Sequence, residues 1–211
     1  METERVSLAR KKIAENLVRA QKEAPAAMCG VQVGATKLLE SKKLYKMDAC
    51  LIYALAAAVL KVPEVNVRWV ETPEGPEIQK YGEELNLGIA VGAKNTLAVV
   101  TLHNTDWKNI AELNQAAASF LEKAKTGKFS PGDFIPQPNI VLNNMSSLHW
   151  MEFGSPLLLP GVTLMVSIFA IKKMPTPTMN VTVTFDHRPL DARPINKFLG
   201  ALKRKIENPQ F

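Results

Sequence analysis

The sequence predicts a single α/β domain of 211 residues in which helices cover a mixed, largely antiparallel sheet. Segments with a helical period of apolar residues are interspersed with short runs of β-branched residues, and no linker, repeat or low-complexity tract divides them. The order of these segments is too irregular for a doubly wound sheet. Glycine loops of the GxGxxG or Walker type are also missing, which argues against the two common nucleotide-binding folds.

Four long helices are expected from the spacing of apolar residues, over 7–22, 47–62, 109–125 and 194–206, with a short one over 36–44. The segment 47–62 is apolar on nearly all sides, as in a buried helix. Asp48 is its expected N-cap, and Gly127 suits the end of the helix over 109–125. Pro194 fits the first turn of the last helix.

Strands are expected between these helices, where β-branched residues are frequent and turn residues flank them. The turn at residues 73–76 (PEGP) predicts a hairpin-like return after the second strand. The expected strands cover residues 28–33, 66–70, 85–91, 97–102, 139–143, 162–171 and 179–185.

Composition excludes several classes of protein. The net charge is +6, but Lys and Arg are scattered and not interleaved with aromatic residues, so we expect no nucleic-acid partner and at most attraction of a phosphorylated cofactor. No apolar run reaches the roughly 18 residues of a membrane helix. The first ten residues lack the apolar stretch of a signal peptide, so we expect a cytoplasmic location. Cys29 and Cys50 are isolated, which predicts neither a metal site nor a disulfide.

The stretch FDHRPLDAR, residues 185–193, is the clearest candidate for chemistry. It places His187 just beyond an alternating strand and before a helix, on a rigid edge of the domain. A neutral imidazole accepts a proton near pH 7, and Asp191 four residues later can orient it or hold the loop. On spacing alone, a histidine with a purely structural hydrogen bond remains the alternative.

A wider stretch, MNVTVTFDHRPLDA at 179–192, resembles the end of the catalytic domain of dihydrolipoamide acyltransferases, the E2 components of 2-oxoacid dehydrogenase complexes. The resemblance covers nearly the whole chain. It implies a single acyltransferase core over 1–211, without a lipoyl or subunit-binding domain, and the two-layer sandwich fold of the related chloramphenicol acetyltransferases. Asp186 favours the lipoamide branch, because chloramphenicol acetyltransferases have a second histidine there. Further matching segments are RKKIA at 10–14, PEVN at 63–66, NLGIAV at 86–91, KTGKFSP at 125–131, KFL at 197–199 and IENP at 206–209.

The resemblance implies acyl transfer between the thiols of dihydrolipoamide and coenzyme A, without a metal. His187 matches the general base of the family. Asp191 matches the motif carboxylate, which is mainly structural, and Arg10 is its expected partner, with Arg188 as further support. Asn143 stands where the family has the serine or threonine that stabilises the oxyanion. The lipoyl group would come from another domain or chain, and the residues that bind coenzyme A are not assigned.

The family also implies a homotrimer in which His187 of one chain faces Asn143 of the next. Such trimers assemble further into cubic or dodecahedral cores that bind the other subunits of the complex; an excised eukaryotic domain would come from the mitochondrial matrix. Two departures, Asn143 and Ala192 in place of the motif's final glycine, leave an alternative open. This is a structural core or interaction subunit with weakened or lost catalysis. A third reading is a coenzyme A-dependent acyltransferase that acts on a small hydroxyl or amine.

Overall fold

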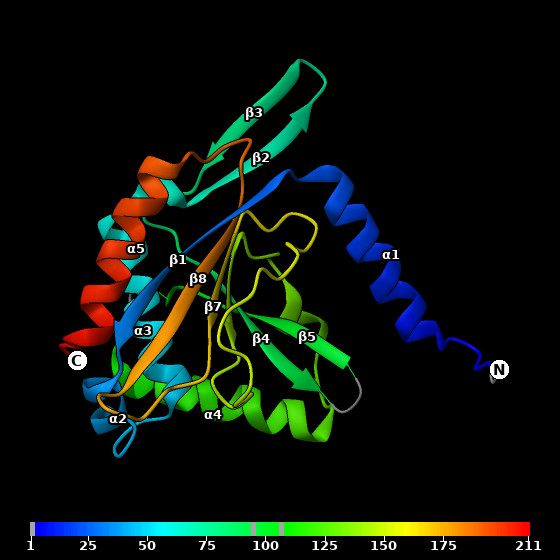
Figure 1. Ribbon diagram of the computed structural model, residues 1–211. Coiled ribbons are helices and arrows are strands. Elements are labelled where there is room, and N and C mark those ends of the chain that lie inside the picture. The colour runs from blue at the N-terminus through cyan, green and yellow to red at the C-terminus, as the bar shows by residue number, and fades with distance from the viewer. Residues whose placement is uncertain (1–2, 94–95, 106–107) are drawn as a thin grey trace.

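A six-stranded mixed sheet forms the centre of the computed structural model, which describes residues 3–93, 96–105 and 108–211 (Figure 1). β6 runs parallel to both of its neighbours, β4 and β7, and the other adjacent strands are antiparallel. The predicted mixed, largely antiparallel sheet is confirmed. In spatial order the strands are β1 (Ala26–Gly34), β8 (Thr178–Asp186), β7 (Leu164–Ile168), β6 (Ile140–Asn144), β4 (Leu87–Ala93) and β5 (Thr96–Leu102).

Helices cover one face of this sheet and enclose the main core (Figure 1). α3 packs against both α4 and α5 and is buried on most of its surface, as its apolar sequence predicts. Along β8, Val181, Val183 and Phe185 point into this core because alternate residues of a strand face the same side. The covering helices are α2 (Thr36–Ser41), α3 (Met47–Lys61), α4 (Ile110–Thr126) and α5 (Ala192–Glu207).

The irregular segment 145–163 covers the middle of the outer face of the sheet. Leu158 and Val162 of this segment form a small second core with Val141 of β6 and Met165 of β7. The backbone oxygen of Gly154 accepts a hydrogen bond from the hydroxyl of Thr182, an outer-face residue of β8. The central strands are therefore covered on both sides, by helices on one and by a long loop on the other, while Met28 and Gly30 on the outer face of β1 are exposed.

Two elements project from this body. The hairpin of β2 (Val67–Thr72) and β3 (Gly75–Lys80) confirms the predicted return and lies beyond one end of the sheet (Figure 1). α1 (Leu8–Glu23) extends away from the sheet at the right of the view in Figure 1. Short 3-10 turns lie at Pro63–Val65 and Pro131–Phe134. No helix of the described ranges is long and apolar enough to span a membrane.

Most helix-capping residues predicted from the sequence occupy helix ends in the structure. Asn109 caps α4 in a reciprocal pair with Glu112, and Gly127 ends that helix with a φ of 71°. The prediction that Asp48 is the N-cap of α3 is wrong: the cap is Lys46, without a side-chain hydrogen bond. Asp48 lies inside the first turn, where its carboxylate accepts a hydrogen bond from the amide of Asn144 at 2.8 Å.

Candidate active site

His187 is the first residue after β8 and is fixed from two directions. Its backbone N–H donates to the carbonyl of Pro25 at 3.0 Å, and its ring lies 5.3 Å from the ring of Phe185, centroid to centroid. Phe185 is fully buried in the main core, so the imidazole rests on a rigid support. Nearly half of the His187 side chain is nevertheless exposed, which leaves it accessible to a reactant.

Asp191 approaches the same imidazole. Its Oδ1 lies 3.8 Å from Nδ1 of His187, too far for a hydrogen bond but close enough for electrostatic attraction. The residue occupies the N-cap position of α5 without a capping hydrogen bond, and its side chain is 89% exposed. Because Nδ1 faces this carboxylate, Nε2 is the ring nitrogen available to a reactant.

Arg10, the expected partner of Asp191, does not contact it within the one described chain. Arg10 is on α1, where its backbone N–H donates to the hydroxyl of Ser7, and among the described residues it forms no ion pair with Asp191. The two sequence motifs identify these residues, but they do not fix the direction of α1 relative to α5. Ala192 begins α5 with ordinary helical backbone, so this position does not require a glycine.

Arg188 clamps the loop that carries His187. Its guanidinium donates through Nε and Nη2 to both carboxylate oxygens of Asp186, with the shortest distance 2.7 Å, and its backbone N–H adds a bond to Oδ1. The guanidinium also lies over the ring of Trp69 in β2, 5.2 Å from the ring centroid. Hydrogen bonding to the Asp186 carboxylate, helped by its charge and by those of Glu71 and Glu23, raises the pKa of Arg188 above its ordinary value.

Asn143 lies near the other end of the sheet. It pairs with Ser167 of β7, which pairs in turn with Thr182 of β8, and His187 follows Thr182 by five residues. With strand spacings of about 4.8 Å and a rise of about 3.3 Å per residue, the two residues are about 16 Å apart along the sheet and about 10 Å across it. His187 and Asn143 of one chain therefore cannot act on the same carbonyl group.

The family model described as 2-oxoacid dehydrogenases acyltransferase (catalytic domain) matches residues 1–211, the whole chain. The chain belongs to this acyltransferase family. The curated relative from Rickettsia bellii, a dihydrolipoyllysine-residue acetyltransferase component of a pyruvate dehydrogenase complex, is 26% identical over 95% of this chain and 51% of its own length. The chain thus spans about half the length of the curated relatives it matches.

Solved structures share the fold of this acyltransferase domain. Dihydrolipoamide acetyltransferase of Azotobacter vinelandii has a TM-score of 0.87 at 18% identity, covering 99% of this chain and 92% of that one. That structure belongs to an investigation of a serine, a histidine and an asparagine four residues after the histidine in the catalytic mechanism. A chloramphenicol acetyltransferase has a TM-score of 0.63 at 12% identity, covering 98% and 100% of the two chains. The predicted sandwich fold is confirmed.

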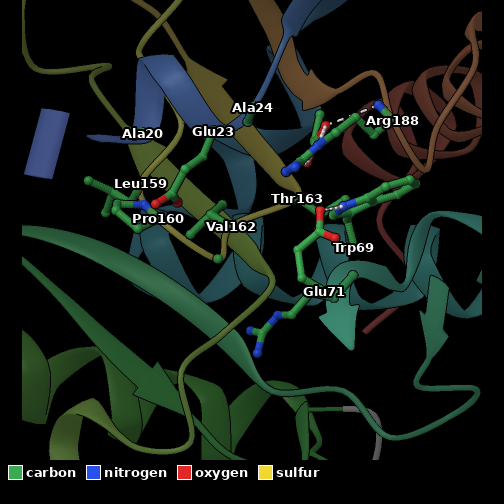
Figure 2. Close-up of a pocket in the computed structure, with 13 residues that line it drawn as sticks. Ala20, Glu23, Ala24, Trp69, Glu71, Leu159, Pro160, Val162, Thr163 and Arg188 are labelled. Carbon is green, nitrogen blue, oxygen red and sulfur yellow. Dashed lines mark hydrogen bonds and ion pairs between the residues drawn. The ribbon is translucent and has the colours of Figure 1, made fainter. Parts of the chain in front are cut away.

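A cavity of about 460 Å³ adjoins the loop that carries His187 in this acyltransferase domain (Figure 2). Asp186 and Arg188, on either side of His187, both line it, together with Trp69 and two carboxylates, Glu23 and Glu71. Figure 2 shows the indole of Trp69 beside the guanidinium of Arg188, and the indole N–H donates to Glu71 at 2.7 Å. Trp69 was not a sequence-based candidate because it precedes Arg188 by more than 100 residues and carries no local motif.

Proposed function

We propose that this chain transfers an acyl group between the thiols of dihydrolipoamide and coenzyme A, with His187 as the general base. The main support for this proposal is the environment of the imidazole: it is half-exposed, packs on the buried ring of Phe185, and has Nδ1 turned toward Asp191. This leaves Nε2 free to take a proton. The same four-residue spacing separates the histidine and asparagine studied in the Azotobacter vinelandii acetyltransferase, which supports a shared role for the position of Asp191.

The chemistry needs a base because a thiol with a pKa of about 8.5 is mostly protonated near neutral pH. The thiol of coenzyme A gives its proton to Nε2 of His187 while the sulfur adds to the carbonyl carbon of the acyl-lipoyl thioester. The carbonyl oxygen then carries the negative charge. When the bond from carbon to the lipoyl sulfur breaks, His187 returns the proton to that sulfur, and acyl-coenzyme A and dihydrolipoamide leave.

Asn143 is the proposed donor to the oxyanion. It is half-buried at the end of β6, and an asparagine Nδ2 provides two N–H groups suited to this task. Its separation from His187 within one chain supports a site formed between two copies, each of which contributes one of these residues. This agrees with the homotrimer that the family resemblance implies.

Exposed apolar side chains in the segment that follows Asn143 in sequence support the same arrangement. The segment that follows β6 presents several large apolar side chains to solvent, and Trp150 is 98% exposed. Clustered apolar side chains of this size on a chain surface are typical of protein–protein interfaces. We therefore expect a second copy to cover this segment. The residues concerned are Leu148, Trp150, Met151, Phe153 and Leu157.

Partners and substrates follow from the same proposal. The lipoyl group would be presented by a lipoyl domain of the same or another chain, and the trimers would form the core of a 2-oxoacid dehydrogenase complex, of cubic or dodecahedral form. Acetyl is the acyl group to test first, because the Rickettsia bellii relative is an acetyltransferase component. Among the described residues, no cluster of three or more metal-ligating side chains occurs.

The decisive assay is acetyl transfer from acetyl-coenzyme A to dihydrolipoamide. We expect the wild-type chain to be active and His187→Ala to lose at least about 100-fold in kcat, since general-base catalysis contributes 10²–10⁴-fold. His103→Ala is the matched control, because His103 is an exposed histidine just beyond β5 and should leave kcat unchanged. Absence of both transfer and coenzyme A binding in the wild type would instead favour a structural core subunit.

Two variants test the role of Asn143 as oxyanion donor. Asn143→Ala should lower kcat by about 100-fold or more, the loss typical of a missing oxyanion donor. Asn143→Ser should retain transfer, since a hydroxyl can also donate to the oxyanion. Equal kcat in the wild type and in both variants would remove Asn143 from the mechanism while leaving the role of His187 intact.

A further inference from the structure

Three polar residues lie side by side on the outer face of the sheet. Asn143 of β6 pairs with Ser167 of β7, and Ser167 pairs with Thr182 of β8. Since adjacent strands lie about 4.8 Å apart and paired residues point to the same face, the three side chains form one row across the sheet. Thr182 and Ser167 are buried beneath the covering loop, and Asn143 at the end of the row is half-buried.

The middle member of the row is unusual. Ser167 is 0% exposed, and its hydroxyl has no hydrogen-bond partner in the part of the chain that the structure describes. A buried hydroxyl without a partner is costly, so such groups are uncommon and call for an explanation. Thr182 is already held by another group, because its hydroxyl donates to the carbonyl of Gly154 at 2.9 Å, and no hydrogen bond joins it to Ser167 in the described structure.

Asn143 is the neighbour with unused hydrogen-bonding groups. Its carboxamide forms no hydrogen bond to any described residue, whereas the adjacent Asn144 is bound to Asp48. On its other side Asn143 pairs with Ala90, which has no polar side-chain atom. Because adjacent strands lie about 4.8 Å apart, rotation about side-chain torsions can bring a serine and an asparagine at paired positions within hydrogen-bonding distance.

We propose that Ser167 is a positioning residue that holds Asn143 for the oxyanion. The Ser167 hydroxyl donates to Oδ1 of Asn143, which turns Nδ2 and its two hydrogens outward from the sheet. This contact satisfies the buried hydroxyl and fixes an amide that otherwise rotates freely. The catalytic part of this inference rests on the proposed function, while the contact itself does not.

The kinetic arm of the test uses Ser167→Ala, which removes the hydroxyl with little change of volume. We expect kcat to fall about five- to tenfold with both KM values unchanged, the size of one lost hydrogen bond. In the Asn143→Ser background the same change should alter kcat less than about twofold, because the carboxamide is gone. Thr101→Val is the control: it removes a buried hydroxyl from the same sheet, bound to the Pro136 carbonyl, and should leave kcat unchanged.

The stability arm needs no activity. If Ser167 binds Asn143, Ser167→Ala should lower Tm by about 2–4 °C, and the effect should vanish in the Asn143→Ala background. If the hydroxyl has no partner, its removal relieves a buried polar group and raises Tm. A raised Tm, or an equal Tm change in both backgrounds, would overturn the inference. An inactive wild type with the predicted Tm coupling would refute the proposed function but keep the contact.

Discussion

Replacing Arg188 by methionine should destabilise the fold by leaving a buried carboxylate without its partner. The side chain of Asp186 is only 5% exposed and accepts three hydrogen bonds from the Arg188 guanidinium. Removing one member of a buried ion pair costs about 3–5 kcal/mol. Because the Arg188 side chain is 28% exposed and the backbone N–H of residue 188 still reaches Asp186, we expect the low end, about 3 kcal/mol, including the lost contact with Trp69.

Urea unfolding at a fixed protein concentration measures this loss, since any oligomer makes stability depend on concentration. Lys172→Met is the matched control. Lys172 contacts Glu152 at the same 2.7 Å, but both side chains are about half exposed, so we expect a change of less than about 0.5 kcal/mol. Arg188→Lys should fall between the two because lysine keeps the charge but not the planar fork. A loss for Arg188→Met no greater than that for Lys172→Met would refute the reasoning.

Three smaller predictions concern the rest of the fold. Gly161→Ala should lower the free energy of unfolding by about 1–2 kcal/mol, because Gly161 has a φ of +75° and an added Cβ would lie 2.8 Å from the Gln137 side chain. Gly200→Ala is the control: inside α5 it should raise the free energy of unfolding by about 0.5–1 kcal/mol. Hydrogen bonding from Lys123 lowers the pKa of Asp133. The ionised Asp133 therefore stabilises the fold at neutral pH, and this contribution is lost as pH falls through the lowered pKa. In urea titrations, Asp133→Asn should destabilise the protein more at pH 7 than at pH 3. Burial raises the pKa of Cys50 to about 11, so this thiol should react with a disulfide reagent at pH 8 only after unfolding.

Local chemistry explains why so much of the fold could be predicted. The end of α4 follows from Gly127, and the hairpin follows from the turn at 73–76; in each case the deciding residues are neighbours in sequence. Asp48 shows the limit of such signals. Its side chain suits an N-cap, but in the fold it accepts a hydrogen bond from Asn144, which is 96 residues away in sequence.

The site was predictable only where a motif is contiguous. His187 and Asp191 are four residues apart on either side of a strand-to-helix turn, so their approach follows from local geometry. Trp69 contacts Arg188 through the position of the hairpin, and Ser167 lies beside Asn143 through strand register. Neither hairpin position nor register can be read from spacing, because both depend on how the whole sheet assembles.

The measurement that tests the central claim most directly is activity in mixed oligomers. His187→Ala and Asn143→Ala should each be nearly inactive alone. When the two chains are coexpressed in equal amounts, random trimers should regain about a quarter of the wild-type sites, since about three quarters of the trimers are mixed and each has one intact interface of three. Acetyl transfer at about a quarter of the wild-type kcat is the predicted result. No activity above that of the two single variants would contradict a site shared between chains.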